Sequence, residues 1–350
     1  MAGYIKKNVK KGSRIAVISK NCAEFIICEI AIWMADCVTV ALFPNLNEST
    51  TKFIFEHSDP KMVFIGKLEE PCWQEMKGAI PSKLDCVKFP LSPDSCDGKK
   101  WEDVLKSSEP ICKSVEDAPT RAKESDAIIV YTSGSTGQPK GVVHTFESLT
   151  APSKGIINLH NITNEDRYLS YLPIAHVMDR FIAECVSMCS GMHIYFAESL
   201  KTFKDDLQRC RPTLFVSVPR LWLKFQLGIF SKVSPGTLNF LFMIPCIGTF
   251  VKGKLLEALG LDQVRFAGSG SAPIPAELLT WYNELGLQLL EGYGMSENFC
   301  YSHTTHPGKA KFGFIGQPVS LCLRGFEICS SDFCSCISQY ILFGKIVPWC

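Results

Sequence analysis

The sequence predicts an α/β fold in which doubly wound, mostly parallel sheets carry helices on both faces. Three observations support this fold class. Short apolar runs typical of buried strands recur along the chain, amphipathic segments separate them, and polar Gly/Ser/Thr segments follow some of the runs. With 350 residues, 46% of them hydrophobic and 20% charged, the chain can bury a large core. Its formal net charge of +1 gives no electrostatic reason to expect nucleic acid as a partner.

The first third of the chain alternates strand and helix signals. Apolar residues between Phe25 and Trp33 are spaced as on one face of a helix, and Asn21 is a candidate N-cap for it. The uninterrupted apolar runs on either side are typical of buried parallel strands. The expected order is strand Arg14–Ser19, helix Cys22–Met34, strand Val38–Leu42, helix Glu48–His57 and strand Met62–Ile65.

A polar, proline-containing stretch from Ser92 to Lys123 interrupts this alternation. We expect two α/β halves to meet near residues 92–125, with one helix near Trp101–Ser107. Beyond it the strand signals return, with one further helix. The expected strands are Ala127–Tyr131, Arg167–Tyr171, His193–Phe196, Leu214–Val218, Gln263–Ala267 and Gln288–Leu290, and the helix is Ala276–Leu285.

The segment from Tyr131 to Gly141, YTSGSTGQPKG, directly follows an expected strand. Its glycines allow the backbone to approach an anion closely, and its hydroxyls and successive N–H groups can form an anion-binding concavity. Lys140 adds a point charge suited to phosphate. The segment is not a Walker loop, because the order G-x-x-x-x-G-K-[ST] is absent. Ser/Thr/Gly clusters also occur in ordinary surface loops, so its interpretation as a phosphate-binding loop depends on the order of all eleven positions after a strand.

The order of these eleven positions closely resembles the phosphate-loop signature of the acyl-adenylate-forming (AMP-binding) superfamily. Two further segments resemble motifs of the same superfamily. Glu291–Glu297, EGYGMSE, is similar to its adenine and magnesium motif, and Ala267–Pro273, AGSGSAP, is similar to its adenine-pocket loop. The latter is not a dinucleotide fingerprint, since Pro273 occupies the place of the last glycine. Tyr171–Arg180 and Phe215–Trp222 resemble the long-chain fatty acid–CoA ligase type in particular.

The resemblance implies the partial N-terminal core of the adenylate-forming fold, with ATP, Mg²⁺ and CoA as cofactors and co-substrate. It implies ATP-dependent activation of a long-chain fatty acid to an acyl-adenylate and then to acyl-CoA. Catalytic roles would fall to Lys140, His176 and Glu297, and Thr136 and Glu297 would hold the metal. The nucleotide would be bound by Thr132, Ser133, Gly134, Ser135, Thr136, Gly137, Lys140, Gly270, Ser271, Ala272, Tyr293, Gly294, Met295 and Ser296.

Residues 1–318 are expected to form this adenylation core, and residues 319–350 a divergent tail with a different composition. The barrel, the ribose-binding aspartate and the C-terminal lid domain of the family have no counterpart that we can assign. We therefore expect either a ligase whose turnover is impaired or an inactive nucleotide- and acyl-binding fragment or pseudoenzyme.

The N-terminus lacks the apolar region of a secretory signal, so we expect a cytoplasmic, not secreted, protein. No window reaches the roughly 18 uninterrupted apolar residues that a membrane-spanning helix needs. The nearest approach is Leu238–Val251, which is shorter and contains Pro245. That segment is where we would expect any peripheral contact with an intracellular membrane. The sequence makes no prediction of oligomeric state.

Overall fold

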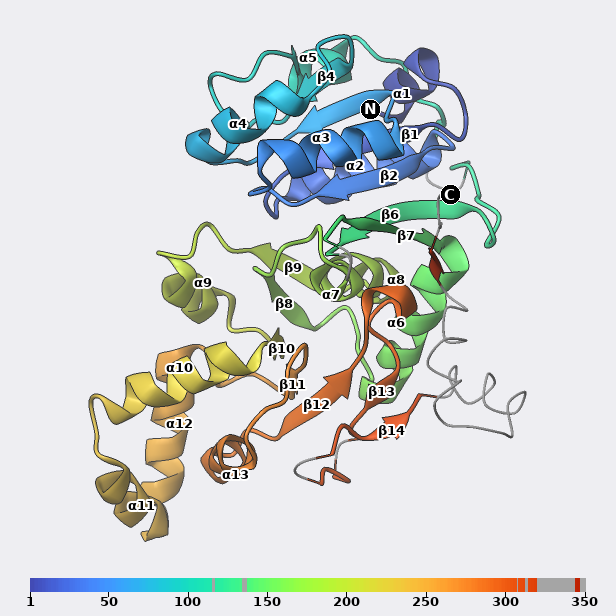
Figure 1. The fold of residues 1–350 in the computed structure, drawn as a ribbon. Helices are drawn as coiled ribbons and strands as arrows, with labels where there is room; N and C mark the ends of the chain where they lie inside the picture. The colour runs from blue at the N-terminus through green and yellow to red at the C-terminus, as the bar shows by residue number, and fades with distance from the viewer. Residues whose placement is uncertain (115–116, 134–136, 307, 312–313, 320–343, 347–350) are drawn as a thin grey trace.

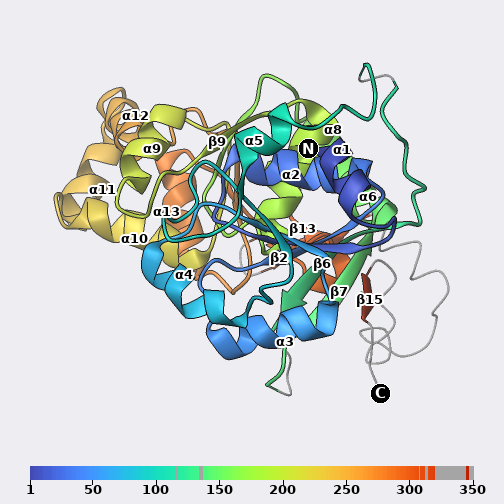
Figure 2. The same ribbon diagram turned by 90° about the horizontal axis from the view of Figure 1, so that it is seen from above.

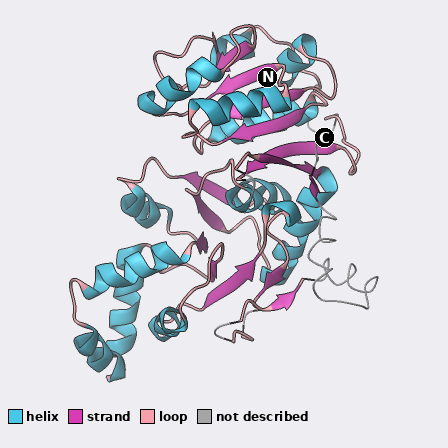
Figure 3. Cartoon of the chain, in the orientation of Figure 1, coloured by secondary structure: helices cyan, strands magenta, loops and turns pink. Residues whose placement is uncertain are grey.

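The computed structural model describes residues 1–114, 117–133, 137–306, 308–311, 314–319 and 344–346. Two β-sheets and their covering helices form successive layers (Figures 1 and 3). Both sheets are mixed but mostly parallel, as the sequence predicts. The predicted fold class, mostly parallel sheets with helices on both faces, is confirmed by this architecture.

The first sheet has eight strands in the order β15-β7-β6-β2-β1-β3-β4-β5. Its central strands pair in parallel, whereas β7 pairs antiparallel with both β6 and β15. The strands are β1 (Arg14–Ile18), β2 (Val38–Leu42), β3 (Met62–Ile65), β4 (Asp85–Lys88), β5 (Lys99–Lys100), β6 (Asp126–Thr132), β7 (Lys140–Thr145) and β15 (Gly344–Ile346).

The second sheet has seven strands in the order β14-β13-β12-β11-β10-β8-β9. Strands β8 to β12 pair in parallel, and the short β13 and β14 add an antiparallel edge. The strands are β8 (Arg167–Ser170), β9 (His193–Phe196), β10 (Leu214–Ser217), β11 (Phe266–Ser269), β12 (Leu289–Tyr293), β13 (His303–Thr304) and β14 (Gln317–Pro318).

Helices cover both faces of each sheet, and Figure 2 shows this for the first sheet. In the first half they are α1 (Ala2–Asn8), α2 (Ala23–Met34), α3 (Glu48–Ser58), α4 (Glu70–Met76), η1 (Lys77–Ala79), α5 (Trp101–Lys106) and α6 (Phe146–His160). In the second half they are α7 (Val177–Asp179), η2 (Arg180–Val186), α8 (Ser187–Ser190), α9 (Phe203–Cys210), α10 (Pro219–Phe230), α11 (Pro235–Met243), α12 (Ile247–Leu259), α13 (Ala276–Leu285) and η3 (Ser296–Asn298).

The side-chain alternation of β1 shows how the layers arise. Ile15 and Val17 join a core that also contains α2, α6 and η2, whereas Ala16 and Ile18 join a separate core with α3 and α4. Successive side chains of a strand point to opposite faces, so a continuous apolar run supplies two cores at once. The first of these cores also receives Val216 from β10. It is therefore the layer shared by the two sheets.

The junction between the two halves differs from the predicted position near 92–125. Strand β6 pairs in parallel with β2, and β7 pairs with β6, so residues up to 145 belong to the first sheet. The chain crosses to the second sheet through α6 (Phe146–His160). After the polar stretch the chain returns to the first sheet, where β6 pairs with the free edge of β2.

Asn21 is not the N-cap of α2, because Cys22 occupies that position and no side-chain cap bond forms. The Asn21 side chain instead points across to the second half of the chain. Its Nδ2 lies 2.7 Å from Ser170 Oγ and 2.8 Å from Asp179 Oδ2, and its Oδ1 accepts a bond of 3.0 Å from the N–H of Ile174. Tyr168 completes this polar cluster by donating a bond of 2.8 Å to Asp179 Oδ1. The bonds join the end of β1 to the segment after β8.

A second buried polar cluster is centred on Arg180, the residue that follows Asp179 of the first cluster. Arg180 on η2 forms an ion pair with Glu29 on α2, and its Nη1 lies 3.4 Å from Glu184 Oε2. All three side chains are fully buried. Burial, reinforced by the charge of Glu29, raises the pKa of Glu184 well above its ordinary value. The Arg180–Glu29 contact is therefore the main ion pair of the cluster, and the Glu184 carboxyl beside it holds its proton more tightly than an exposed glutamate does.

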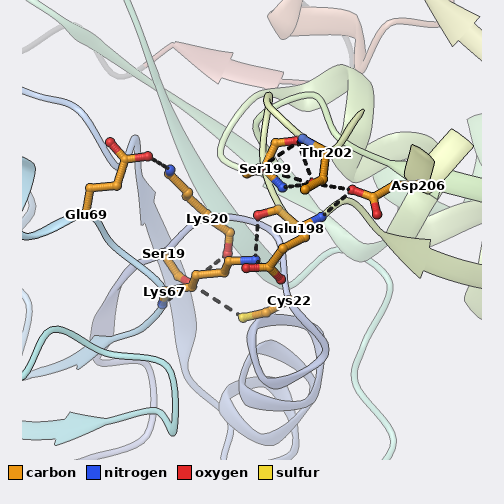
Figure 4. A network of polar contacts seen from close by, with 9 residues as sticks. All are labelled: Ser19, Lys20, Cys22, Lys67, Glu69, Glu198, Ser199, Thr202 and Asp206. Carbon is orange, nitrogen blue, oxygen red and sulfur yellow. Dashed lines mark hydrogen bonds and ion pairs between the residues drawn. The ribbon is translucent and has the colours of Figure 1, made fainter. Parts of the chain in front are cut away.

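A third contact between the halves lies nearer the surface. Lys67, just beyond β3, donates a bond of 2.9 Å to the carbonyl oxygen of Glu198 and lies 3.0 Å from Glu198 Oε2. Figure 4 shows Lys67 reaching from the loop of the first sheet to the loop after β9. Asp206 Oδ2 accepts a bond of 3.0 Å from the Glu198 N–H, which holds that loop in place.

The segment Leu238–Val251 forms parts of two helices. Helix α11 (Pro235–Met243) ends before Pro245, Cys246 has a φ of 66°, and α12 (Ile247–Leu259) begins directly after it. Among the described residues, no helix is long and apolar enough to cross a membrane.

Asp179 makes the stability of the fold dependent on pH. Its complete burial raises the pKa of its carboxyl from 3.8 to about 7, against the opposing effect of its hydrogen bonds. Below about pH 4 both folded and unfolded states bind this proton, whereas above about pH 7 neither does. Between these values only the folded state keeps it, so the contribution of Asp179 to the unfolding free energy falls as pH rises. The expected loss is up to about 4 kcal/mol.

The comparison of wild type with Asp179→Asn isolates this effect. The difference in unfolding free energy between them, measured by urea denaturation, should move in favour of the variant as pH rises from about 4 to about 7. A difference that does not change across this range would contradict the assignment. Asp166→Asn is the matched control, because the pKa of that buried carboxyl is lowered and its stabilisation instead grows as pH rises through the acidic range.

Candidate active site

The carboxyl ends of β10, β11 and β12 meet at one edge of the second sheet. The three strands are parallel and in register, with Val216 beside Gly268 and Ser269 beside Glu291. Ligands of open α/β sheets bind at this edge, because the loops that follow the strands diverge there. The loops carrying the second and third motifs begin at this edge, so the structure brings those two predicted segments together.

The second motif loop approaches the third with almost no space between them. A Cβ built on Gly270 would lie 3.3 Å from the carbonyl oxygen of Gly292. The next residue, Ser271, has a φ of 67°, a backbone angle that residues other than glycine rarely adopt. Ala272 continues this loop toward α13 (Ala276–Leu285). Such strain persists only where the surroundings impose it, and it is concentrated at functional loops.

The third motif loop folds back on itself after β12. Met295 N–H donates a bond of 2.9 Å to Asn298 Oδ1, and η3 (Ser296–Asn298) lies between them. Phe299 and Cys300 both have positive φ angles, 51° and 59°. Tyr293 ends the strand with 47% of its surface exposed. An exposed aromatic ring at the edge of a sheet is suited to stacking against a planar ligand.

His144 of β7 links the first sheet to this loop. A carbonyl oxygen can only accept, so the contact of 2.7 Å between His144 Nε2 and Ser296 O means that Nε2 carries a proton. The fully buried imidazole also packs edge-on against Phe299, with ring centroids 5.1 Å apart. The link positions η3, and with it Glu297, against the strand that begins at Lys140.

The first motif spans the turn between β6 and β7. Thr132 and Lys140 are partners across this hairpin, and Ser133 and Gly137 follow and precede them in the turn. Gly137 has a φ of 86°. The predicted ligands Gly134, Ser135 and Thr136 lie outside the described residues. Lys140 is exposed and has no ion-pair partner among the residues that the structure describes.

Glu297 is half-buried in η3. Within the described part of the chain, its carboxylate has no cation or hydrogen-bond donor beside it. A nucleotide-bound Mg²⁺ requires one or two carboxylates plus phosphate oxygens, so a single free carboxylate fits that demand. No group of three or more His, Cys, Asp or Glu side chains among the described residues forms a site of its own for a metal. The residues thus suit a metal carried by a phosphate ligand.

His176 is placed near the second and third motifs. Its Nδ1 accepts a bond of 3.1 Å from the N–H of Met178, and Met178 Cε lies 3.8 Å from the position of a Gly270 Cβ. Burial lowers the pKa of His176, so its imidazole is neutral at physiological pH. The local role of His176 is to cap α7, which leaves Nε2 for a ligand contact.

A cavity of about 60 Å³ lies beneath these loops, between the second sheet and α6 and η2. Apolar side chains supply much of its lining, including Met178, Phe181, Val216 and Leu290. Polar groups also line it, among them Ser269, Glu291 and His303. The buried Ser269 hydroxyl has no hydrogen-bond partner among the described residues, so a ligand or water in the cavity would satisfy it.

Sequence reasoning missed Ser269, His144 and the buried Asp179–Arg180 pair. Ser269 lies inside the second motif as quoted, but its hydroxyl is recognisable only once its burial is known. His144 follows the first motif by three positions in an ordinary alternating strand, which carries no separate signal. Asp179 and Arg180 close the segment that contains His176, and their partners Asn21 and Glu29 lie more than a hundred residues away in sequence.

Together the fold and the motif geometry define the N-terminal domain of an adenylate-forming enzyme. The sequence comparison agrees, because residues 1–324 match the AMP-binding enzyme family. The chain therefore belongs to the AMP-binding enzyme family.

Its curated relatives include several acyl-CoA synthetases. Long chain acyl-CoA synthetase 4 of Arabidopsis thaliana is 28% identical over 352 residues, which cover 89% of this chain and 52% of the relative. Long-chain-fatty-acid–CoA ligase 5 of Rattus norvegicus is 25% identical, with 87% of this chain and 49% of the relative covered. The chain thus spans about half the length of the curated relatives it matches.

Solved structures share the fold. The anthranilate CoA ligase AuaEII in complex with anthranoyl-AMP superposes with a TM-score of 0.73 at 18% identity, covering 91% of this chain and 57% of that one. ATP-bound MatB from Rhodopseudomonas palustris superposes with a TM-score of 0.68 at 21% identity, covering 91% and 57%.

Gly294 of the third motif and Gly270 of the second differ in how closely the surrounding atoms approach them, which gives a testable contrast. A Cβ on Gly294 would lie 2.4 Å from Cys300 Cα, a backbone atom that cannot move alone. Gly294→Ala should therefore lower the unfolding free energy by about 1–3 kcal/mol, as overpacking does. Gly270→Ala, with its nearest contact at 3.3 Å, is the control and should cost less than about 1 kcal/mol. Equal losses in urea denaturation would show that the loop after β12 is not as closely packed as described.

Proposed function

We propose that this site binds ATP and a long-chain fatty acid and supports formation of an acyl-adenylate, which CoA then converts to acyl-CoA. The observation that carries the proposal is the position of an apolar cavity directly beneath the second and third motif loops. His303, which lines the cavity, packs edge-on against the exposed Tyr293 ring. A fatty acid in the cavity would thus present its carboxylate where the phosphates of ATP are expected.

The chemistry asks the protein mainly to position reactants and to neutralise charge. One carboxylate oxygen attacks the α-phosphorus of ATP, the bond to the β-phosphate oxygen breaks, and pyrophosphate leaves. In the second step the thiolate of CoA attacks the acyl carbonyl carbon, and AMP leaves with the electron pair of the mixed anhydride bond. No electron donor or acceptor is needed, and the proton of the CoA thiol passes to solvent.

The residues of this chain divide these tasks. Lys140, which has no acidic partner among the described residues, would neutralise phosphate charge that develops as pyrophosphate leaves. Glu297 would hold Mg²⁺, which would supply charge neutralisation on the phosphates. Tyr293 would stack on adenine, and backbone groups of Gly270, Ser271, Ala272 and Gly294 would shape the pocket for it. His176, held neutral by burial, would donate or accept one hydrogen bond at the acyl carboxylate.

A second candidate is nucleotide and acyl binding without turnover, and the small size of the cavity counts against efficient turnover of a long acyl chain. Drug-sized ligands occupy about 300–1,000 Å³, whereas this cavity offers about 60 Å³. A long acyl chain would enter only if the aromatic lining, including Phe181 and Tyr301, moved aside. Isothermal titration with ATP distinguishes the two candidates: saturable binding without any pyrophosphate exchange favours the second.

Exchange of labelled pyrophosphate into ATP with palmitate tests the leading proposal. Wild type should show palmitate-dependent exchange, and Lys140→Ala should reduce its rate by about a hundredfold or more, since removing one preorganised charge-stabilising group has that effect. Lys61→Ala is the matched control. Lys61 immediately precedes β3, which β1 and β2 separate from β6, so the rate of this variant should equal that of wild type.

Three outcomes would count against the proposal. These are an absence of exchange in wild type with intact ATP binding, equal exchange in wild type and Lys140→Ala, and exchange that requires an aryl or amino acid in place of palmitate. A series of saturated acids of increasing length identifies the preferred substrate.

A further inference from the structure

The helical hairpin α11–α12 carries four large apolar side chains that no part of the described structure covers. Phe240, Met243, Ile247 and Phe250 are 62%, 73%, 47% and 66% exposed. They lie toward the end of α11 and the start of α12, on either side of a short turn, and we call these four residues the hairpin tip. Isolated exposed apolar residues are common, but a group of this size marks a binding surface.

The tip is held open by the backbone of the hairpin. A Cβ on Gly248 would lie 2.7 Å from the carbonyl oxygen of Phe242, so the two helices approach as closely as glycine allows. The opposite side of the hairpin is anchored, since Leu238 joins the core that contains Trp222 and Tyr282. In Figure 1 the hairpin projects from the second sheet at the end of the molecule away from the first sheet. The tip therefore cannot fold back to bury itself without breaking this anchor.

The charge of the segment from α10 to α12 is strongly biased. Residues 219–259 contain five cations and one acid, Glu257, a net charge of +4 in a chain whose total is +1. The remaining residues therefore sum to −3. The cations are Arg220, Lys224, Lys232, Lys252 and Lys254. Lys252 Nζ lies 4.9 Å from the centre of the ring of Phe242, the half-buried residue before Met243, and Lys254 is paired with Glu257.

We propose that the hairpin tip enters the interfacial region of a lipid bilayer that carries anionic headgroups. Amphipathic helices with aromatic and aliphatic side chains on one side and lysines beside them bind such interfaces, because apolar burial and electrostatic attraction add. Lysine side chains extend their charge to the headgroups while their methylene stems remain in the apolar zone. The tip combines both features, whereas a protein partner would have to supply an acidic rim around an apolar pocket.

The location of the hairpin gives such binding a consequence for the site. Helix α10 begins at Pro219, directly after β10, and Val216 of β10 lines the cavity. Trp222 of α10 donates a bond of 3.3 Å to the carbonyl oxygen of Gly268 in β11. A docked tip would thus hold the cavity-bearing edge of the second sheet near the lipid that contains fatty acid. Lipid binding itself does not depend on the proposed catalytic activity.

Sedimentation with vesicles tests the proposal on the full chain. Two vesicle types are used, phosphatidylcholine alone and phosphatidylcholine with about 30 mol% phosphatidylserine. Wild type should bind the anionic vesicles at least about tenfold more tightly than the neutral ones, and raised salt should weaken the binding. Met243→Glu with Phe250→Glu should lower the affinity for anionic vesicles by about tenfold or more.

Two control variants separate lipid contact from changes in folding. Leu91→Glu with Leu200→Glu places the same two charges on exposed apolar residues outside the hairpin, and it should retain nearly all of the wild-type affinity for vesicles. Lys252→Gln with Lys232→Gln should weaken binding to anionic vesicles and leave binding to neutral vesicles unchanged. Circular dichroism spectra and thermal midpoints that match wild type confirm that each variant is folded.

Certain results would overturn the proposal. These are equal binding by wild type and the tip variant, an equal loss in the Leu91 and Leu200 variant, and wild-type binding that ignores headgroup charge. A wild-type dimer that the tip variant converts to a monomer, with no vesicle binding by either, would identify a second copy of the chain as the occupant. Pyrophosphate exchange in detergent-free solution remains a separate readout, so failure of lipid binding and failure of the catalytic proposal are distinguishable.

Discussion

Arg180 on η2, beside the second sheet, forms a fully buried ion pair with Glu29 on α2, beside the first sheet, and Glu184 lies four residues after Arg180 on η2 itself. A buried guanidinium without its partners costs several kcal/mol, so neither half can bury its share of this cluster without the other. The polar cluster of Asn21, Ser170 and Asp179 imposes the same requirement a few residues away. We infer that these clusters determine the relative orientation of the sheets. The contact between His144 of β7 and Ser296 of the third motif loop, which joins the two sheets, depends on that orientation.

Local pattern predicted the elements well, because a buried parallel strand has a recognisable composition and the motifs have a recognisable order. The boundaries of β2, β3 and β9 agree with the predicted ranges to the residue. The predicted position of the junction between the halves differs from the structure, because β6 pairs with β2. Composition does not indicate which free strand edge a later strand will join. The prediction that Asn21 caps α2 was wrong for a similar reason. Its side chain satisfies buried acceptors that lie about 150 residues away, and these outweigh a local capping bond.

The candidate site was predictable where residue type determines the chemistry and not where burial does. Lys140, Glu297 and Tyr293 could be identified as candidates from the sequence, because each stands at a fixed place in a motif of known order. The hydroxyl of Ser269 and the tautomer of His144 acquire meaning only from their surroundings. Backbone strain adds a further feature that sequence conceals, because Ser271, Phe299 and Cys300 all adopt left-handed conformations. Each costs on the order of 1–3 kcal/mol, and the packing around β7 and β12 offsets this cost.

The late arrival of β6 has a consequence for the growing chain. Thr39 of β2 pairs with Ile128 of β6. During synthesis one edge of β2 therefore stays unpaired until about ninety further residues have been made. At ordinary ribosomal speeds of about 5–20 residues per second, the delay is on the order of 5–20 s. Throughout this interval a fully buried strand of Val, Thr and Leu presents open hydrogen-bonding groups, which is the usual starting point of intermolecular pairing. The nascent chain is accordingly a natural client for chaperones that bind extended apolar segments.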